Sequence, residues 1–384
     1  MTAITDSLER RRDAIAVSGW GARFHFFQPH NACFWVYLGL VASGLWYVIT
    51  AVQSTRGAFN EAYATALVSS GLFTLAFLWF LHWSDRWERT PASLALAAFV
   101  GGGVAAPFAI AITGNGAIMS IYTKVFGQAW ATDWQAGLTA PFVEETSKGA
   151  IFLLMMGLAP VVIRTVSDGL IVGAYVGLGF QILEDIFYAQ NAAFAQFGAH
   201  QSEAVLGTFA LRAITGIPSH ALYTALFGAG LVYVIGTSAQ PRRVGRGLAL
   251  VAAAMLFHGV WDSAAAIGGP VFVLFVLFLT MVFCLVALFV AIRWAGGRER
   301  EFMRDIMTPE VANGTISAAE LDALTGHGKD TRAAETRPEG VSRRREKHVL
   351  RAARDLAGDL AASDGADTPE VEHSRAEISR LRPH

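Results

Sequence analysis

The sequence is poor in charge and in cysteine. Only 16% of its 384 residues are charged, whereas 53% are hydrophobic and the mean hydropathy is +0.41. This composition excludes an ordinary soluble domain, in which charged residues are more frequent. The formal net charge of -1 shows no basic excess of the kind that nucleic-acid binding requires. The two cysteines, Cys33 and Cys284, lie in or beside apolar segments, so no disulfide framework is expected.

Several common catalytic motifs are also absent. The sequence contains no P-loop, no GxSxG serine motif and no zinc-knuckle spacing. It also lacks HExxH, which excludes the chemistry of ordinary zincin metalloproteases. A removable signal peptide is not expected, because the first apolar run begins only near residue 34 and has no small-residue cleavage site.

Long apolar runs are abundant. Each of eight runs is long enough to cross a bilayer about 30 Å thick, which takes about 20 helical residues. The sixth is too long for one straight span, and Gly216 with Pro218 predicts a kink or break just before His220. The runs lie near 34–52, 64–82, 92–112, 137–158, 166–189, 205–235, 247–267 and 271–294. The predicted fold is an all-α polytopic membrane protein with about eight transmembrane helices.

Basic residues alternate between the loops that join these runs. Every second loop is basic, with Arg86 and Arg89, then Arg164, then Arg242, Arg243 and Arg246, then Arg298 and Arg300. The intervening loops hold only Arg56 and Lys124. Because basic loops stay on the cytoplasmic side, we expect a multi-pass protein of the cell membrane with both termini in the cytoplasm.

Three regions follow from this pattern. Residues 1–30 form a polar cytoplasmic lead, and 31–295 form the membrane domain. Residues 296–384 are rich in Arg, Glu, Asp and Ala and predict a charged, partly disordered cytoplasmic tail. Within this tail, helices are expected from about 342 to 362 and over 369–381.

Ionisable side chains are concentrated in the interiors of spans four to seven. Intramembrane charge costs roughly 2.5–3.5 kcal/mol per group, so it indicates a functional site. The ten groups are Glu144, Glu145, Lys148, Asp168, Glu184, Asp185, Arg212, His220, His258 and Asp262. We therefore predict a polar catalytic core of four helices, held in an apolar scaffold.

The stretch APFVEETSKG at 140–149 is the centre of this core. Glu144 and Lys148 share a helix face and can neutralise each other, whereas Glu145 has no such obvious partner. Taken alone, the stretch could also be an ion pair at the membrane interface. His258 and Asp262 have the same four-residue spacing, so the carboxylate can bond the ring of the histidine.

The positions of these groups along their helices place them at a similar depth in the membrane. Glu144 and Glu145 lie about two turns from the outer end of span four, and Glu184 follows about 18 residues of span five, at about 1.5 Å each. His258 falls near the midplane, and His220 is compatible with that depth. These side chains can therefore meet between the midplane and the outer leaflet.

Four segments resemble the signature segments of the PrsW family of intramembrane proteases. They cover about 135–265 and read APFVEETSKG, SDGLIVGAYVGLGFQILEDIFYAQN, RAITGIPSHALYTALFGAGL and LFHGVWDS. The family is more distantly similar to the CAAX prenyl-protein and bacteriocin-processing proteases. The resemblance implies functional roles for Glu144, Glu145, Lys148, Glu184, His220 and His258. Asp185 and Asp262 depart from it, since Asn is frequent at both positions.

Two mechanisms fit these residues. In the first, His220, His258 and a carboxylate, Glu184 or Glu144, hold a divalent metal, zinc, and Glu145 is the general base. In the second, Glu145 deprotonates water without a metal, and the histidines orient substrate and stabilise the oxyanion. The candidate catalytic residues are Glu144, Glu145, Lys148 and Asp262, and the candidate metal ligands are Glu184, His220 and His258.

An ion- or proton-coupled transporter is the alternative from another class, because buried charges can also form a relay. The four-helix block shows no internal repeat, and its charges cluster in one half of the protein, which disfavours transport. The resemblance instead implies an intramembrane metalloprotease. Its expected partner is a single-span membrane protein, such as an anti-sigma factor cut near its extracytoplasmic side.

Overall fold

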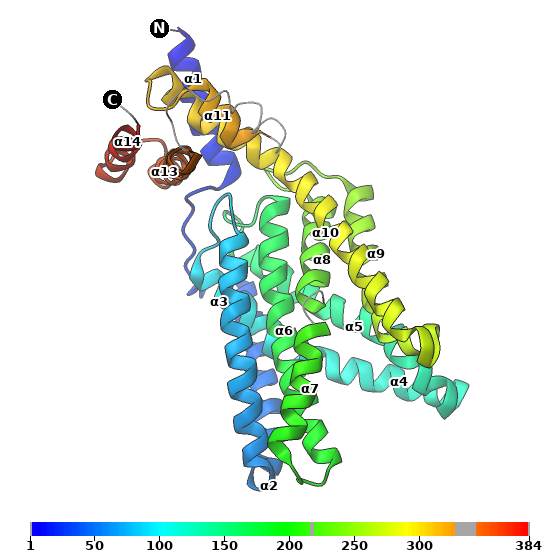
Figure 1. Ribbon diagram of the computed structural model, residues 1–384. Helices are drawn as coiled ribbons and strands as arrows, with labels where there is room; N and C mark the ends of the chain where they lie inside the picture. Colours follow the sequence, from blue (N-terminus) through cyan, green and yellow to red (C-terminus); the bar gives the residue numbers. More distant parts are fainter. Residues whose placement is uncertain (1, 216–218, 327–342, 383–384) are drawn as a thin grey trace. The chain divides into compact units, whose positions relative to one another are not determined.

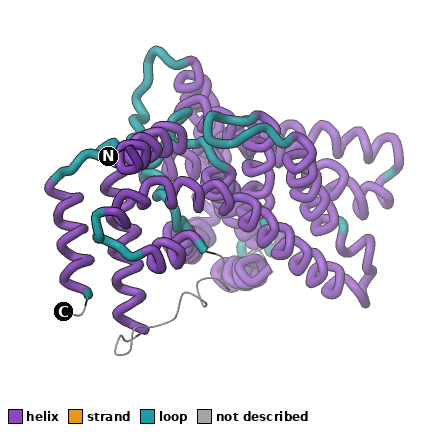
Figure 2. The backbone as a smooth tube through the Cα atoms, turned by 90° about the horizontal axis from the view of Figure 1, so that it is seen from above, coloured by secondary structure: helices purple, strands orange, loops and turns teal. Residues whose placement is uncertain are grey.

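The computed structural model describes residues 2–215, 219–326 and 343–382, and within these ranges it contains helices and loops but no strand (Figure 2). The all-α prediction is confirmed. The chain divides into two compact units. The central unit comprises Phe24–Gly236 and Arg242–Ile292, and the terminal unit comprises Met1–Arg23, Thr237–Pro241 and Arg293–His384.

The central unit contains most of the long apolar helices. Its helices are α2 (Ala32–Ser84), α3 (Ala92–Val100), π-helical η1 (Gly101–Ala111), α4 (Ile112–Phe126), α5 (Gln128–Leu158), α6 (Val166–Ala195), α7 (Gln201–Thr215), α8 (His220–Ile235), α9 (Val244–Asp262) and the first part of α10 (Ala264–Ala312). Five helical stretches among the described residues are long and apolar enough to cross a membrane. They are α2, the continuous helix Ala92–Phe126, α6, α9 and α10. The chain is therefore a multi-pass membrane protein.

Helix α2 contains the first two predicted runs. Its backbone is non-helical at Phe59, where two helical arms meet. The Tyr37 hydroxyl, near the start of α2, donates to the Ala97 carbonyl over 2.8 Å. Because Ala97 comes soon after the end of α2, both ends of this helix lie close together. A straight helix of 53 residues would separate them by about 80 Å, so the two arms run in opposite directions.

The predicted sixth run is divided into two helices. Helix α7 ends at Thr215 and α8 begins at His220. The predicted break at Gly216 and Pro218 lies outside the described residues. The separation gives His220 the first position of α8, where it faces α6.

Helix α6 lies between α3 and α8 (Figure 1). Two of its glycines allow the neighbouring backbones to come close. A Cβ atom at Gly177 would lie 2.2 Å from the His220 carbonyl oxygen, and one at Gly179 would lie 2.0 Å from the Phe99 carbonyl oxygen. Only glycine fits these positions, so tight packing on α6 fixes the backbone at His220.

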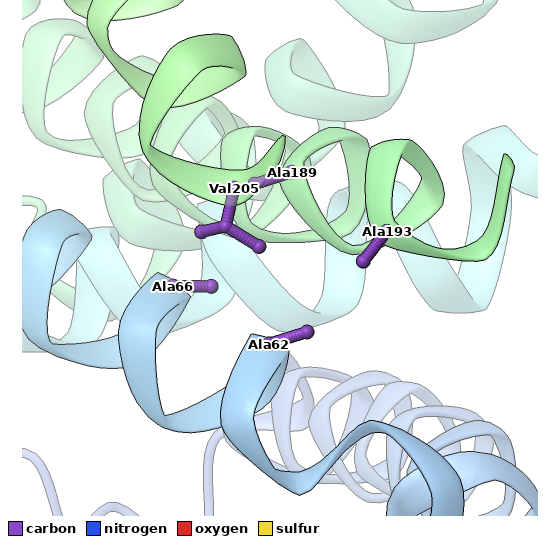
Figure 3. Close-up of a cluster of buried hydrophobic side chains, with 5 residues drawn as sticks. All are labelled: Ala62, Ala66, Ala189, Ala193 and Val205. Atoms are coloured by element: carbon purple, nitrogen blue, oxygen red, sulfur yellow. The ribbon is translucent and has the colours of Figure 1, made fainter. Parts of the chain in front are cut away.

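A cluster of small apolar side chains joins α2, α6 and α7 (Figure 3). Ala62 and Ala66 of α2 face Ala189 and Ala193 of α6, and Val205 of α7 closes the cluster. All five side chains are fully buried. The cluster docks the N-terminal half of α7 onto the unit without using any charged group.

The segment between the third and fourth predicted runs is helical. The third run continues through η1 into α4, and α5 begins at Gln128, earlier than the predicted 137. Gly127, with a φ of +87°, makes the turn between these helices. Asn115, which the sequence placed in an outer loop, is thereby carried on a helix that packs against α5.

The terminal unit contains α1 (Thr2–Ser18), the end of α10, α11 (Ala318–Thr325), α13 (Arg343–Ala362) and α14 (Pro369–Leu381). Helices α13 and α14 match the two helices predicted in the tail. Their packed side chains include Leu356, Leu360, Val371 and Ile378, all fully buried. The described residues of 296–384 are thus mostly helical and have their own core, whereas the predicted domain boundaries remain a prediction.

Candidate active site

Helices α5, α6, α8 and α9 bring the predicted site residues together. All seven belong to one network of hydrogen bonds and ion pairs, namely Glu144, Glu145, Lys148, Glu184, His220, His258 and Asp262. Most are buried within the protein. Four helices therefore contribute to one polar centre inside an apolar bundle.

Lys148 is the hub of this network. Its ammonium lies 2.7 Å from Glu145 Oε1, 3.7 Å from Glu144 Oε2 and 2.8 Å from His220 Nδ1. It also sits over the Phe180 ring, 3.9 Å from the centroid. The sequence spacing predicted the pairing with Glu144, and the structure adds a closer one with Glu145.

Glu145 is completely buried and fully engaged. Its Oε1 atom faces Lys148 and His258 Nδ1, the latter at 3.0 Å. Its Oε2 atom accepts a hydrogen bond from the Thr224 hydroxyl over 3.1 Å. Because both oxygens have partners, this carboxylate is suited to holding its neighbours in place.

The hydrogen bonds of His220 define its tautomer. The Lys148 ammonium can only donate, so Nδ1 accepts its hydrogen bond. The Nε2 atom, 2.9 Å from Glu184 Oε2, then carries the proton and donates it to that carboxylate. Both ring nitrogens of His220 are thus used in the observed arrangement.

The two ring nitrogens of His258 face different carboxylates. Its Nδ1 atom lies 3.0 Å from Glu145 Oε1, and in the neutral ring that donates from Nδ1 the Nε2 atom carries the lone pair. This Nε2 atom lies 3.4 Å from Asp262 Oδ2 and 3.7 Å from Glu144 Oε2. The ring stacks on Tyr223 with centroids 5.3 Å apart, so its plane is fixed.

Glu144 has one buried carboxylate oxygen that makes no hydrogen bond among the described residues, a feature that it shares with Asp185. Its Oε1 atom accepts from Asn115 Nδ2 over 2.9 Å. Its Oε2 atom is buried without a hydrogen-bond partner among the described residues. A buried carboxylate oxygen in this state is costly unless it serves a water, an ion or a substrate.

One compact group in the site could hold a metal ion. Glu144, His220 and His258 each offer a ligand atom, and these atoms lie within 4.8 Å of one another. Two imidazoles and a carboxylate are donors that catalytic zinc accepts, and the free Glu144 oxygen fits such a ligand. The sequence left Glu144 and Glu184 open as the carboxylate, and the group contains Glu144. Ligation through His220 Nε2 requires the other tautomer of the neutral ring, in which Nδ1 carries the proton and no longer accepts from Lys148.

Four further residues contact the site and were given no role from the sequence. Asn115 was hidden because its helix was not predicted. Arg212 was among the ten intramembrane charged groups, but its partners on another helix could not be predicted. Thr224 and Tyr223 follow His220 on α8, where their period resembles ordinary core packing. The intramembrane charge of Arg212 placed it among the candidate groups, although no specific role was predicted for it.

The comparisons with known proteins agree with this geometry. No curated protein and no solved structure matches the chain. Among protein-family models, the one described as "PrsW family intramembrane metalloprotease" matches residues 90–291, which is more than half of the chain and includes every residue of the network. The chain belongs to the PrsW family of intramembrane proteases.

Proposed function

We propose that this protein hydrolyses a peptide bond of a membrane-tethered protein, with Glu144 and His258 at the reacting centre. The expected substrate is a single-span membrane protein, of the anti-sigma type, cut toward its extracytoplasmic side. We also propose eight spans and cytoplasmic termini, because the basic loops alternate as described above.

The free oxygen of Glu144 carries this proposal. Peptide hydrolysis needs a group that can take a proton from water, and that group must have an unoccupied acceptor. Glu144 Oε2 is such an acceptor and lies 3.7 Å from His258 Nε2. A water between these two atoms would meet a carboxylate and an imidazole lone pair.

Glu145 is assigned a positioning role in place of the base predicted from the sequence. Its bond to His258 Nδ1 directs the His258 Nε2 lone pair toward Glu144. Its burial and its three partners leave no free oxygen for water. Lys148 holds Glu145 and His220 together, and its positive charge offsets the buried acids.

A divalent metal, zinc, is the proposed cofactor, held by Glu144, His220 and His258. Bound there, it would supply Lewis-acid polarisation of the peptide carbonyl and a more acidic water. Glu184 would orient the His220 ring, and Asp262 would accept a hydrogen bond from substrate or water beside His258. With the metal bound, Glu144 would be a ligand and would have no open oxygen, so Glu144 would act as the base only in a site without metal.

The test is cleavage of a panel of single-span membrane reporters in liposomes, together with elemental analysis of the purified protein. Glu144→Gln should reduce cleavage by about 10²–10⁴-fold, the range for removing a general base. With bound zinc, the wild type should contain roughly one metal per chain, and His258→Ala should lose it. If Glu144→Gln cleaved at the wild-type rate, Glu144 would not belong to the reacting centre. If the purified wild type contained no bound metal, the mechanism without metal would remain.

A further inference from the structure

Arg212 of α7 contacts the site without a part in the proposed function. Its Nη2 atom donates to Glu184 Oε2 over 2.8 Å, and its Nε atom donates to Asp185 Oδ1. The guanidinium also lies over the Tyr188 ring, 4.1 Å from the centroid. Arg212 is therefore held on three sides by neighbouring residues of α6.

Glu184 connects this arginine to His220. The Glu184 Oε2 atom accepts from Arg212 and also from His220 Nε2, the latter over 2.9 Å. Since the two donors share one oxygen, the planar guanidinium limits the directions in which the carboxylate can face the histidine. Arg212 of α7 thus restricts the orientation of Glu184, the carboxylate that accepts a hydrogen bond from His220 of α8.

Asp185 has a different relation to Arg212. It is a buried acid whose other oxygen, Oδ2, has no hydrogen-bond partner among the described residues. In the PrsW resemblance this position is frequently Asn, so the present chain carries an extra negative charge here. Arg212 could neutralise that charge, hold Glu184, or do both, and the two roles make different predictions.

The docking of α7 does not depend on Arg212. The Ser202 hydroxyl donates to Glu61 Oε1 over 2.6 Å and lies 2.9 Å from the Thr65 hydroxyl. Val205 packs in the small apolar cluster with α2 and α6 (Figure 3). These contacts anchor the first half of α7. Arg212, in the second half, is therefore not needed to dock the helix and is available for a role in the site.

We propose that Arg212 is a positioning residue, which holds the Glu184 carboxylate against His220 while Asp185 holds the guanidinium. The inference rests on the proposed function and extends the site to α7. It assigns Arg212 an effect on the chemical step through Glu184 and His220 rather than a contact with substrate.

Steady-state cleavage of one fluorogenic single-span reporter in liposomes tests the role. Arg212→Gln should lower kcat by about 10²-fold with KM unchanged, as expected for a misplaced catalytic group. Arg212→Lys, which keeps the charge and one donor to Glu184, should recover part of the loss. Glu203→Gln, the control on the same helix, removes an exposed acid that pairs with His200 at the surface and should keep wild-type kcat.

The double variant Asp185→Asn/Arg212→Gln separates the two roles of the arginine. It restores the charge balance but not the hold on Glu184, so kcat should stay as low as in Arg212→Gln. Recovery of wild-type kcat would mean that Arg212 only neutralises Asp185 and would overturn the proposal. A raised KM at unchanged kcat in Arg212→Gln would also overturn it, because that result indicates a substrate contact.

A thermal double-mutant cycle checks the contact without any cleavage. Melting temperatures in detergent are compared for Glu184→Gln, Arg212→Gln and the combined variant. The combined shift should be smaller than the sum of the single shifts, because both changes remove the same bond. Additive shifts would show that Arg212 does not hold Glu184, even if the protein is an active protease. Shifts that are not additive would support the contact, even if Glu144→Gln contradicts the proposed function. If Arg212→Gln does not fold, Arg212→Lys takes its place in the cycle.

Discussion

Each unit of the protein buries a cluster of charged side chains, and the two clusters differ in how completely they are bonded. In the terminal unit, Glu310 lies between two arginines. Its Oε1 atom accepts from Arg11 Nη2 and Arg375 Nη2, over 2.7 and 2.8 Å, and its Oε2 atom accepts from Arg375 Nε over 2.9 Å. Arg11 Nε also donates to the Ile306 carbonyl. Every oxygen of the acid is used, and the cluster joins α1, α10 and α14.

The cluster in the central unit is incomplete. Glu145 and Lys148 have their partners, but Glu144 keeps one buried oxygen without a hydrogen bond. A fully bonded buried charge mainly holds structure, because nothing remains for an incoming molecule. A buried charge with an open acceptor is available for chemistry. The difference between Glu310 and Glu144 is thus the best structural guide to which cluster is the active site.

The largest expected effects come from replacing the adjacent acids Glu144 and Glu145, because one change should affect mainly cleavage and the other should also affect stability. Glu144→Gln should reduce cleavage by about 10²–10⁴-fold at an unchanged melting temperature, since the residue lacks one bond already. Glu145→Gln should also reduce cleavage, but it should lower the free energy of unfolding by about 3–5 kcal/mol, because Lys148 loses its closest acid. Reporter cleavage and melting in detergent measure the two effects.

The opposite pattern would refute the distinction between these two acids. If Glu144→Gln melted well below wild type while Glu145→Gln kept its stability, Glu144 would be the structural acid. Glu203→Gln, which changes an exposed acid on α7, provides the baseline for both measurements.

Glu310→Gln should destabilise the terminal unit by about 3–5 kcal/mol, since it leaves two guanidinium groups without their shared acid. Melting of the full chain in detergent checks this result. The matched control is Glu377→Gln, which removes an acid that pairs with Arg380 at the surface. Because an exposed ion pair contributes little to stability, this control should melt like wild type. Equal shifts for the two variants would show that the buried cluster is dispensable.

Acid should break the terminal cluster in a predictable range. Burial by itself would raise the pKa of Glu310, but hydrogen bonds from Arg375 and Arg11 outweigh it and hold the pKa below its usual value. The folded pKa is thus lower than the unfolded pKa, which is about 4.3. The stabilisation is then complete above the unfolded pKa and is lost as the pH falls through the folded pKa. Wild type should lose melting temperature below about pH 4, and Glu310→Gln should lose less over the same range.

The residues of the central site could be predicted from the sequence because they occur in short, recognisable local patterns. Intramembrane charge marked Glu144, Lys148 and His258, and helical periodicity placed them on facing helices. Which acid approaches Lys148 most closely could not be predicted, since spacings of three and four both fit one helix face. Side-chain rotamers decide between Glu144 and Glu145, and the sequence does not specify them.

Contacts between distant segments were the main omission. Arg11 and Glu310 are 299 residues apart, and each looks like an ordinary surface charge in its own helix. The charged composition of the tail predicted partial disorder, which stays a prediction, and the described residues of the tail pack into a unit with α1. Such pairs carry no periodicity, so only the tertiary structure reveals them. Asn115 was missed for a related reason, because α4 follows a π-helical stretch that begins within a predicted span.

Asn115 provides the finest test of the comparison, because among the described residues it alone donates a hydrogen bond to the Glu144 carboxylate. Asn115→Ala should lower kcat by about tenfold, in line with the loss of one hydrogen bond to a charged group. Asn115→Asp should have a larger effect, since a second carboxylate would then face Glu144. The control is Thr123→Ala on the same helix, whose hydroxyl contacts Met119 and Gln135 rather than the site. If Asn115→Ala cleaves like Thr123→Ala, Glu144 does not need orientation, and its open oxygen alone would then account for its role.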